Sequence, residues 1–395
     1  MGEMNQYLVL EYVRDHPKTT RTDIASELGL SMASVSRIVT ALLAEGRLVE
    51  VGNEAAEGLG RPRVGLEINL GLDAVLGIDL GGTKCHGALA DISGRILTEA
   101  VVTVEAAGGA LPALDRVWQM LAADAAERGL TVASAAVGVP AVVDQNTGVA
   151  WRGPNVGWDG VQVGAHLAQY QVPVLIDNDV KLAAIAEGAT GKAAGVSDYV
   201  LLSIGTGLGG AVVSGGHLVR GRVNAAGEFG VMIPTLEMLQ QNRHGQTGGL
   251  ESILSGAGIK AHVEALRAAN ADAAAELPEG AGAREVIAGA QERLPHSTAL
   301  MQQIVDALAL AIINVCAVAD PEVIVVDGTV GRALAPFFPE AAAIVARHLE
   351  DAPRIVPSEL GPNSTVRGAI AGAVQRYRSA GAPDLLGTPT EGIGA

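Results

Sequence analysis

The stretch VLGIDLGGTK, residues 75–84, decides the fold of this chain. It begins as an apolar β-strand that ends at Asp79, after which Gly81 and Gly82 can adopt positive φ angles and reverse the chain. The next residues, Cys85–Asp91, alternate in polarity as a second strand does, so the stretch predicts a β-hairpin. A P-loop is excluded, because that motif carries its glycines and lysine at the start of a helix.

A glycine turn of this kind suits phosphate binding. Gly81 and Gly82 let main-chain N–H groups approach a phosphate, and Asp79 is placed to hold a Mg²⁺ ion that bridges phosphates. An ordinary tight hairpin without a ligand is the alternative.

The stretch YVLLSIGTGLGG, residues 199–210, repeats this arrangement. An apolar run ends at Gly205, a glycine-rich turn follows, and Ala211–Ser214 resumes β-strand character. The letters from Gly205 to Gly210 also fit GxGxxG, but a dinucleotide-binding motif needs a helix directly after it, and the next residues read as two short strands. Two such units predict an internally duplicated α/β body with a nucleotide-sized cleft between its halves.

The composition limits the class of protein. The chain has 395 residues, 49% of them apolar, which is enough for two or three domains. Its formal net charge of −16 argues against non-specific coating of nucleic acid, so any DNA contact must come from a local patch. Cys85 and Cys316 lie in apolar contexts and are expected to be buried thiols, which fits a reducing cytoplasm. We see no apolar run of the ~18–20 residues that a membrane span needs and no signal sequence, so no membrane contact is expected.

The first 70 residues have the pattern of a winged helix-turn-helix domain. Gln6–Asp15 is helical by its apolar spacing, and a second helix follows a cap at Thr20 or Thr22 and ends at Gly29. A third helix starts at Leu30-Ser31 with its apolar residues on one face. The strands of a β-wing are expected at Leu48–Val51 and Arg63–Ile68.

The exposed positions of the third helix carry short hydroxyl side chains and one arginine, which suit base edges and phosphates in a major groove. Arginines at the tip of the wing suit a minor groove or the backbone. The predicted DNA-binding residues are Ser31, Ser34, Ser36, Arg37, Thr40, Arg61 and Arg63. The alternative is a dimerisation or docking module without DNA, and the charges of residues 1–70, seven Lys and Arg against ten Asp and Glu, do not decide between them.

Strands and helices then alternate through the rest of the chain. The strand Val174–Asp177 closes on Asp177-Asn178-Asp179 before a helix, and Ala268–Gly289 reads as an insertion or mobile helical excursion. A helix is expected from about Ala299 to Ala319, before the strand Glu322–Asp327. We therefore predict a DNA-binding domain at residues 1–70, a first α/β lobe at 71–185, a second α/β lobe at 186–380 and a disordered tail at 381–395.

Seven motifs taken together resemble the ROK family, which groups bacterial repressors, sugar-responsive regulators and sugar kinases. They are GRP at Gly60–Pro62, GIDLGGTK at Gly77–Lys84, PNVGW at Pro154–Trp158, DNDV at Asp177–Val180, IGTGLGG at Ile204–Gly210, AAGEFG at Ala225–Gly230 and DPEVIVVDG at Asp320–Gly328. Each is weak alone, but their joint order over about residues 5–380 is highly specific. The resemblance implies an actin-like (ribonuclease H-like) two-lobed fold behind the winged helix, with sugar at the floor of a cleft and nucleotide above it.

The resemblance also implies roles for individual residues. Asp179 matches the aspartate that accepts the proton of the attacking sugar hydroxyl in kinase members, as a general base. Without the resemblance, Asp177-Asn178-Asp179 could equally be a capped helix start and Glu228 could be a solvated loop acid. The residues expected to hold a sugar or sugar derivative are Asn155, Asn178, Asp179, Glu228, His244 and Glu251. The residues expected to hold phosphate or Mg-ATP, if that function is retained, are Asp79, Gly81, Gly82, Thr83, Lys84, Gly205, Thr206 and Gly207.

The chain departs from the family pattern at two places. Most members carry a zinc site of one histidine and three cysteines, and the matching positions here are Val231, Asn242, His244 and Gly249. A structural zinc ion needs four N, S or O donors, so we predict no zinc, although His244 could partly take over sugar contact. The second departure is Asp327, where the nucleotide side normally has glycine, and its carboxylate would repel a triphosphate unless a cation intervenes.

Three functions remain open. The first is a sugar-responsive transcriptional regulator, most simply a repressor, that binds a palindromic operator as a homodimer or tetramer and a sugar or sugar phosphate in its body. The second is an ATP-dependent sugar kinase with an auxiliary DNA-binding domain. The third is a sugar sensor that acts through protein partners, which the arginines at positions 37, 61 and 63 make less favourable.

Overall fold

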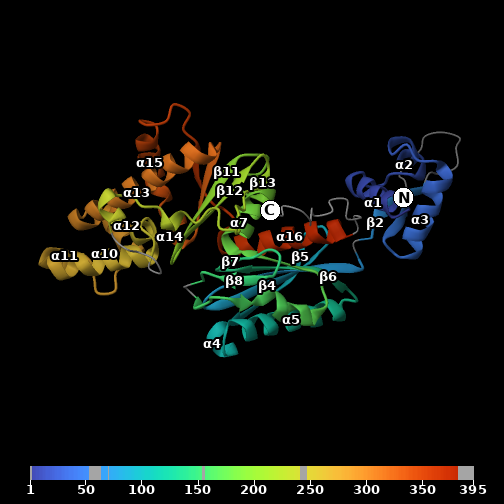
Figure 1. Ribbon diagram of the computed structural model, residues 1–395, viewed down its shortest axis with the longest axis horizontal. Coiled ribbons are helices and arrows are strands. Elements are labelled where there is room, and N and C mark those ends of the chain that lie inside the picture. Colours follow the sequence, from blue (N-terminus) through green and yellow to red (C-terminus); the bar gives the residue numbers. More distant parts are fainter. Residues whose placement is uncertain (1, 53–63, 70, 154–155, 241–246, 381–395) are drawn as a thin grey trace, which may run out of the picture.

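The computed structural model describes residues 2–52, 64–69, 71–153, 156–240 and 247–380 (Figure 1). Three helices and a β-hairpin at the N-terminus form a small domain, called the head below, which stands beside a larger body (Figure 1). Its elements are α1 (Gly2–Asp15), α2 (Arg21–Glu27), α3 (Met32–Ala44), β1 (Leu48–Gly52) and β2 (Val64–Ile68). The head has its own core, in which Val9, Val35 and Leu42 are fully buried.

Side-chain caps set the helix boundaries in the head. The Thr20 hydroxyl accepts a hydrogen bond from the Asp23 N–H, and the Asp23 carboxylate accepts one from the Thr20 N–H. Gly29 turns the chain with a φ of 63°, and the Ser31 hydroxyl accepts the Ser34 N–H at the start of α3. The predicted helix-turn-helix is therefore confirmed, with Thr20 as the cap of α2.

The body has two lobes, each built on a five-stranded sheet. The strand order in the first lobe is β10-β6-β3-β4-β5, where β3 and β4 form the predicted antiparallel hairpin and β6 and β10 join in parallel. Its elements are β3 (Asp73–Leu80), β4 (Lys84–Asp91), β5 (Ile96–Thr103), α4 (Val104–Ala107), α5 (Ala110–Glu127), β6 (Thr131–Val139), α6 (Val163–Leu167) and β10 (Val174–Asn178). A small separate sheet contains β7 (Val142–Val143), β8 (Val149–Trp151) and β9 (Val161–Gln162).

The second lobe repeats this order as β13-β12-β11-β14-β15. Its strands are β11 (Tyr199–Ile204), β12 (Leu208–Ser214), β13 (His217–Leu218), β14 (Val323–Asp327) and β15 (Arg354–Pro357). Its helices are α8 (Leu236–Leu239), α9 (Glu251–Leu254), α10 (Gly256–Ala269), α11 (Ala271–Glu276), α12 (Ala283–Gln291), α13 (Pro295–Ala319), α14 (Thr329–Ala333) and α15 (Phe338–Val345). In both lobes an antiparallel hairpin is followed by two strands that add in parallel, so the predicted internal duplication is confirmed.

The two lobes exchange helices. α7 (Asp179–Thr190) follows the last strand of the first sheet, yet Ala183 and Ala184 pack against the second sheet. α16 (Ser364–Ala380) follows the last strand of the second sheet, yet Val366 and Ile370 pack against the first (Figure 1). The expected second lobe at residues 186–380 is therefore wrong at its end, because α16 covers the sheet of the first lobe.

The apolar packing also corrects two expectations about helices. The segment Ala268–Gly289 is not a mobile excursion: it is largely helical, and Ala273, Leu277 and Val286 are buried in the core of the second lobe. α13 is long and apolar enough to cross a membrane by length and composition, contrary to the expectation that no run qualifies, but half of its apolar window is buried inside the second lobe.

Candidate functional site

Four carboxylates from different parts of the body lie within electrostatic range of one another. Asp79 lies near the end of β3, Asp179 is the first residue of α7, Glu228 follows β13 in a loop, and Glu251 is the first residue of α9. Asp179 interacts with both Asp79 and Glu228, and Glu228 interacts with Glu251. The predicted sugar-binding acids Asp179, Glu228 and Glu251 are thus brought together with the predicted phosphate-side Asp79.

Two of these carboxyl groups titrate close to neutral pH. Burial, helped by the charges of Asp79 and Glu228 and opposed by a hydrogen bond from the Val180 N–H, raises the pKa of Asp179 to about 7. Burial likewise raises the pKa of Asp79, and with the opposing charge of Lys84 included it reaches about 6. An acid with a pKa near 7 can accept and release a proton under physiological conditions, which is what a general base requires.

Glu228 is half-buried, so it is not the solvated loop acid that the sequence left open. Burial raises its pKa, opposed first by Lys181, while Glu251 raises it and Arg152 lowers it. Arg152 is a site residue that the sequence analysis missed; its guanidinium stacks over the Trp151 ring at 4.6 Å. Glu251 is held in place by the N–H groups of Leu208 and Gly248, at 3.2 and 3.3 Å.

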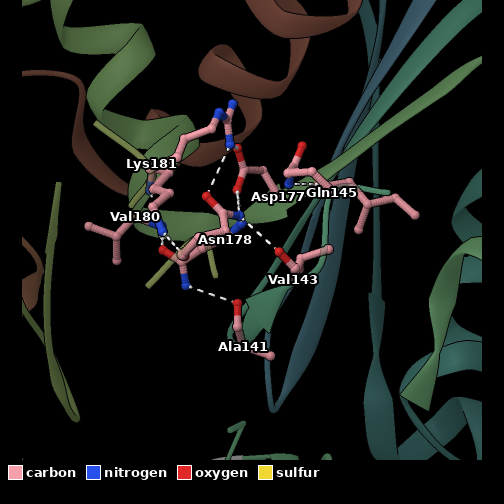
Figure 2. A network of polar contacts seen from close by, with 10 residues as sticks. Ala141, Val143, Gln145, Asp177, Asn178, Val180 and Lys181 are labelled. Atoms are coloured by element: carbon pink, nitrogen blue, oxygen red, sulfur yellow. Dashed lines mark hydrogen bonds and ion pairs between the residues drawn. The ribbon is translucent and has the colours of Figure 1, made fainter. Parts of the chain in front are cut away.

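The side chain of Asn178 forms hydrogen bonds with main-chain groups. Its side-chain oxygen accepts hydrogen bonds from the N–H groups of Val180 and Lys181, and its amide donates to the Ala141 carbonyl at 3.3 Å (Figure 2). The N-cap role that the sequence left open is therefore the role seen in the structure, and sugar contact by Asn178 stays a prediction. Asn155 and His244, also expected to contact the sugar, lie outside the described residues.

The two glycine turns are closed by main-chain hydrogen bonds. The Gly81 N–H donates to the Lys84 carbonyl at 2.9 Å, while Thr83 and Lys84 are exposed at the tip of the β3–β4 hairpin. In the second turn the carbonyls of Gly205 and Thr206 accept N–H groups from the start of α10, at 2.8 and 3.2 Å, and the Gly205 N–H donates to Gly207. Both turns are ordered main-chain structures at the ends of equivalent strands.

Asp327 does not present an unbalanced charge to the nucleotide side. It is 3% exposed, forms an ion pair with Arg332 and accepts a hydrogen bond from the Ser364 hydroxyl at 2.9 Å. The repulsion expected from the sequence is therefore offset, because a cation of the chain itself lies against the carboxylate. Gly328, next in the chain, has a φ of 84°, and a Cβ there would lie 2.2 Å from the Ile204 carbonyl oxygen.

The position of the family's zinc histidine is occupied by Val231, whose side chain is 67% exposed. A valine and Gly249 supply no metal ligand through their side chains, and Asn242 and His244 lie outside the described residues. No cluster of three or more His, Cys, Asp and Glu side chains arranged for a metal ion occurs in the part of the chain that the structure describes. The absence of zinc stays a prediction.

The head presents the predicted reading surface on α3. Ser31, Arg37 and Thr40 are exposed and Ser34 and Ser36 are half-buried, while Val35, Ile38 and Val39 face the core. The Ser31 hydroxyl also donates to the Ser34 hydroxyl at 2.9 Å. The wing tip with Arg61 and Arg63 lies outside the described residues.

Comparison with known proteins agrees with both parts of the fold. The ROK family model matches residues 75–376, and a winged helix-turn-helix DNA-binding model matches residues 5–49. The chain is 29% identical over 234 residues to the xylose repressor of Caldicellulosiruptor bescii, covering 58% of each chain. A solved ROK family transcriptional regulator, a homologue of the E. coli MLC protein, has a TM-score of 0.77 at 24% identity and covers 96% of this chain and 97% of its own. The ROK hexokinase of Thermus thermophilus has a TM-score of 0.63 at 26% identity and covers 78% of this chain and 99% of its own.

The hexokinase thus resembles only a part of this chain, although nearly its whole length is matched, whereas the regulator matches almost the whole of this chain. The ROK model alone covers well over half of the residues, from β3 to α16. This chain belongs to the ROK family, and it carries a winged helix-turn-helix DNA-binding domain at its N-terminus.

Proposed function

We propose that this protein is a sugar-responsive transcriptional repressor that acts in the cytoplasm. The observation that carries the proposal is the covalent joining of a DNA-binding head to a body in which Asp179, Glu228 and Glu251 converge. Carboxylates accept hydrogen bonds in defined directions, which suits the hydroxyl groups of a sugar. The similarity to a xylose repressor, and the fold shared with a ROK transcriptional regulator over 96% of the chain, support this assignment.

The mechanism we propose is linkage between two binding sites. A sugar bound between the lobes favours one arrangement of the body, and the head is then held in an orientation that fits the operator less well. A palindromic operator and a homodimer or tetramer follow from the small size of one head, because two half-sites double the contacts that one recognition helix can make.

The test is selection of genomic DNA fragments by the full-length protein, followed by release of the selected operator with D-xylose, D-glucose and their phosphates. We expect a symmetric site and release by at least one sugar. Glu228→Gln is expected to retain operator binding and to lose the release. Failure to select any defined DNA site would contradict the repressor assignment. If a site is selected but no sugar releases the protein from it, only the proposal that the effector is a sugar is contradicted.

Catalysis of sugar phosphorylation is a second candidate, and one observation favours it: Asp327, which the sequence counted against nucleotide, is neutralised by Arg332. The residues present fit Mg-ATP, with Asp79 for the magnesium ion and the turns at Gly81–Lys84 and Gly205–Gly207 for phosphates. When bound, Mg-ATP would supply the phosphoryl group. Asp179, with a pKa of about 7, would accept the proton of the sugar hydroxyl.

An assay of ADP release over a panel of hexoses, pentoses and amino sugars tests this candidate. Sugar-dependent turnover that Asp179→Asn abolishes would support it. Absence of turnover in a preparation that binds sugar would contradict it and leave the repressor assignment untouched.

A further inference from the structure

A lysine lies fully buried beneath the converging carboxylates. Lys181 is on the first turn of α7, two residues after Asp179, and its side chain is 1% exposed. Its ammonium group donates a hydrogen bond to the main-chain carbonyl of Asn224. Burial of an ammonium group is costly unless groups of opposite charge and hydrogen-bond acceptors surround it, and burial accordingly lowers the pKa of Lys181.

The segment that receives this hydrogen bond leads directly to Glu228. Asn224 is 5% exposed and has a φ of 58°, so the chain makes a tight left-handed bend there. Its side-chain amide donates to the Val143 carbonyl at 3.0 Å and to the Asp177 carboxylate at 2.9 Å. Arg220 donates to the same Asp177 carboxylate and to the Asn224 side-chain oxygen at 3.2 Å. The loop from the second lobe is therefore fastened to β7 and β10 of the first.

Figure 2 shows this arrangement from close by, with Asp177, Asn178 and Lys181 in one continuous network of polar contacts between the end of β10 and the start of α7. Asn178 and Lys181 belong to the same turn of the chain that presents Asp179. One network thus holds two different elements, the helix start with Asp179 and the loop with Glu228.

The charges around the lysine are unevenly distributed. Asp177, Glu228 and Asp179 attract its ammonium group, and Arg220 repels it. The charges that act on Glu228 are those of Lys181 on α7, Glu251 on α9 and Arg152 after β8, and the carboxylate of Asp179 is coupled to it as well. A methionine of nearly the same volume would fill the space of Lys181 but would supply neither the hydrogen bond to Asn224 nor the positive charge beside Glu228.

We propose that Lys181 is a positioning residue for the effector: its ammonium group holds the loop that carries Glu228 against the start of α7, so that Glu228 and Asp179 face the same bound sugar. The proposal rests on the proposed sugar-binding function of this site. Lys181 does not contact the sugar itself, because its side chain is fully buried. It acts through the Asn224 carbonyl and through its charge.

The first experiment needs no ligand. Lys181→Met, Glu228→Gln and the double variant are compared by denaturant midpoint from about pH 4 to pH 8, with the exposed Lys260→Met on α10 as control. Removal of the cation raises the pKa of Glu228 further above its unfolded value. The denaturant midpoint of Lys181→Met should therefore fall more steeply than that of the wild type as the pH rises through this range. In the Glu228→Gln background we expect a clearly smaller loss. The proposal would be overturned if Lys181→Met lowered the denaturant midpoint equally in the wild type and in Glu228→Gln and left the pH dependence as in the wild type.

The second experiment measures the site itself. Binding of D-xylose and of D-glucose is titrated calorimetrically between about pH 5 and pH 8 for the wild type, Lys181→Met and Lys260→Met. Lys181→Met is expected to weaken binding of whichever sugar the wild type binds by about tenfold or more, and to move the acid limb of the profile to higher pH. A uniform loss at every pH would indicate a merely structural lysine. Binding of neither sugar by the wild type would count against the proposed effectors, while the ligand-free comparison would still decide the role of Lys181.

Discussion

Asp179 is held in conditions that disfavour its charged form. Burial and the neighbouring carboxylates raise its pKa to about 7, so the folded protein retains a proton that the unfolded chain releases at much lower pH. The proposed sugar site therefore carries an energetic penalty in the protein without ligand.

Replacement of Asp179 by asparagine is expected to stabilise the protein at alkaline pH. Because the folded-state pKa of about 7 lies above the ordinary 3.8, the penalty is absent below about pH 4, grows as the pH rises and is complete above about pH 7. The neutral amide of the Asp179→Asn variant would avoid this penalty, so chemical denaturation near pH 8 should show a gain of roughly 1–3 kcal/mol that disappears near pH 4. The exposed Asp351→Asn is the control. A gain of equal size at both pH values would contradict the assigned cause.

Single residues also mark how far the sequence could predict the site. The acids Asp179, Glu228 and Glu251 were expected together from the family resemblance, and their electrostatic coupling agrees with that expectation. Lys181 and Arg152 were missed. A lysine on an alanine-rich helix ordinarily points to solvent, and the burial of Lys181 depends on a loop more than forty residues away. The one available signal was its place, two residues after an acidic cluster.

Among the elements, α3 carries most of the predicted DNA-binding residues, and several of them are exposed. Arg37 is exposed at its centre, with Ser34 one turn earlier on the same side. Arg37→Gln is expected to weaken operator binding and to reduce the dependence of log affinity on log salt concentration by about one phosphate contact. Binding is measured at several salt concentrations on the selected operator, with the exposed Arg367→Gln of the body as control. An unchanged salt slope would mean that Arg37 does not contact phosphate.

The contact between α16 and α7 leaves no room for a side chain at Gly368. A Cβ there would lie 1.7 Å from the Leu182 carbonyl oxygen, so Gly368→Ala forces the two helices apart. The expected loss of unfolding free energy is about 2–3 kcal/mol or more, since main-chain atoms cannot move aside as a side chain would. Chemical denaturation measures it, with Gly52→Ala as a control at a glycine that has open space around it. Wild-type stability of Gly368→Ala would mean that the helices are less closely packed.

The elements themselves were largely predictable, and their partners were not. Alternating polarity and glycine turns were enough to predict both hairpins, and a capping threonine was enough to predict the start of α2. The helix exchange between lobes was missed, because α7 and α16 are apolar on more than one side and local sequence does not say which sheet each face meets. Residues 268–289 were expected to be an insertion or a mobile helical excursion, because alanine and glycine are compatible with both a buried and an exposed helix.

At the scale of the whole molecule, Ile68 links the head to the body. It packs against the core of the head and also against the cluster of α16 and the first sheet. Beside it a cavity of about 340 Å³ lies between the two parts, lined by Val13 and Arg47 of the head and Tyr377 of α16. Tyr377 donates a hydrogen bond to Asp73 at 2.7 Å, at the start of β3. Ile68 and the side chains around this cavity are therefore where the head meets the body.

Ile68→Ala is expected to uncouple the two parts. The head should unfold at a lower temperature than the body in calorimetry, and amide exchange should increase in the last turns of α16, because their apolar partner is lost. Leu66→Ala is the matched control, since Leu66 is fully buried in the head core alone and should destabilise the head without affecting α16. Equal amide exchange of α16 in the two variants would contradict a link through Ile68.

The exchange of helices also orders the events of biosynthesis. The head is complete soon after its β-hairpin has left the ribosome, and most of the second lobe can close around α13 and β14 in turn. The first sheet waits longest, since the face with Val75, Ala88 and Ala136 is not covered by α16 until this helix, which follows every strand in the chain, has been made. A product that stops before α16 would thus carry a finished DNA-binding head on a body whose first lobe exposes an apolar surface, and we expect proteases to degrade it.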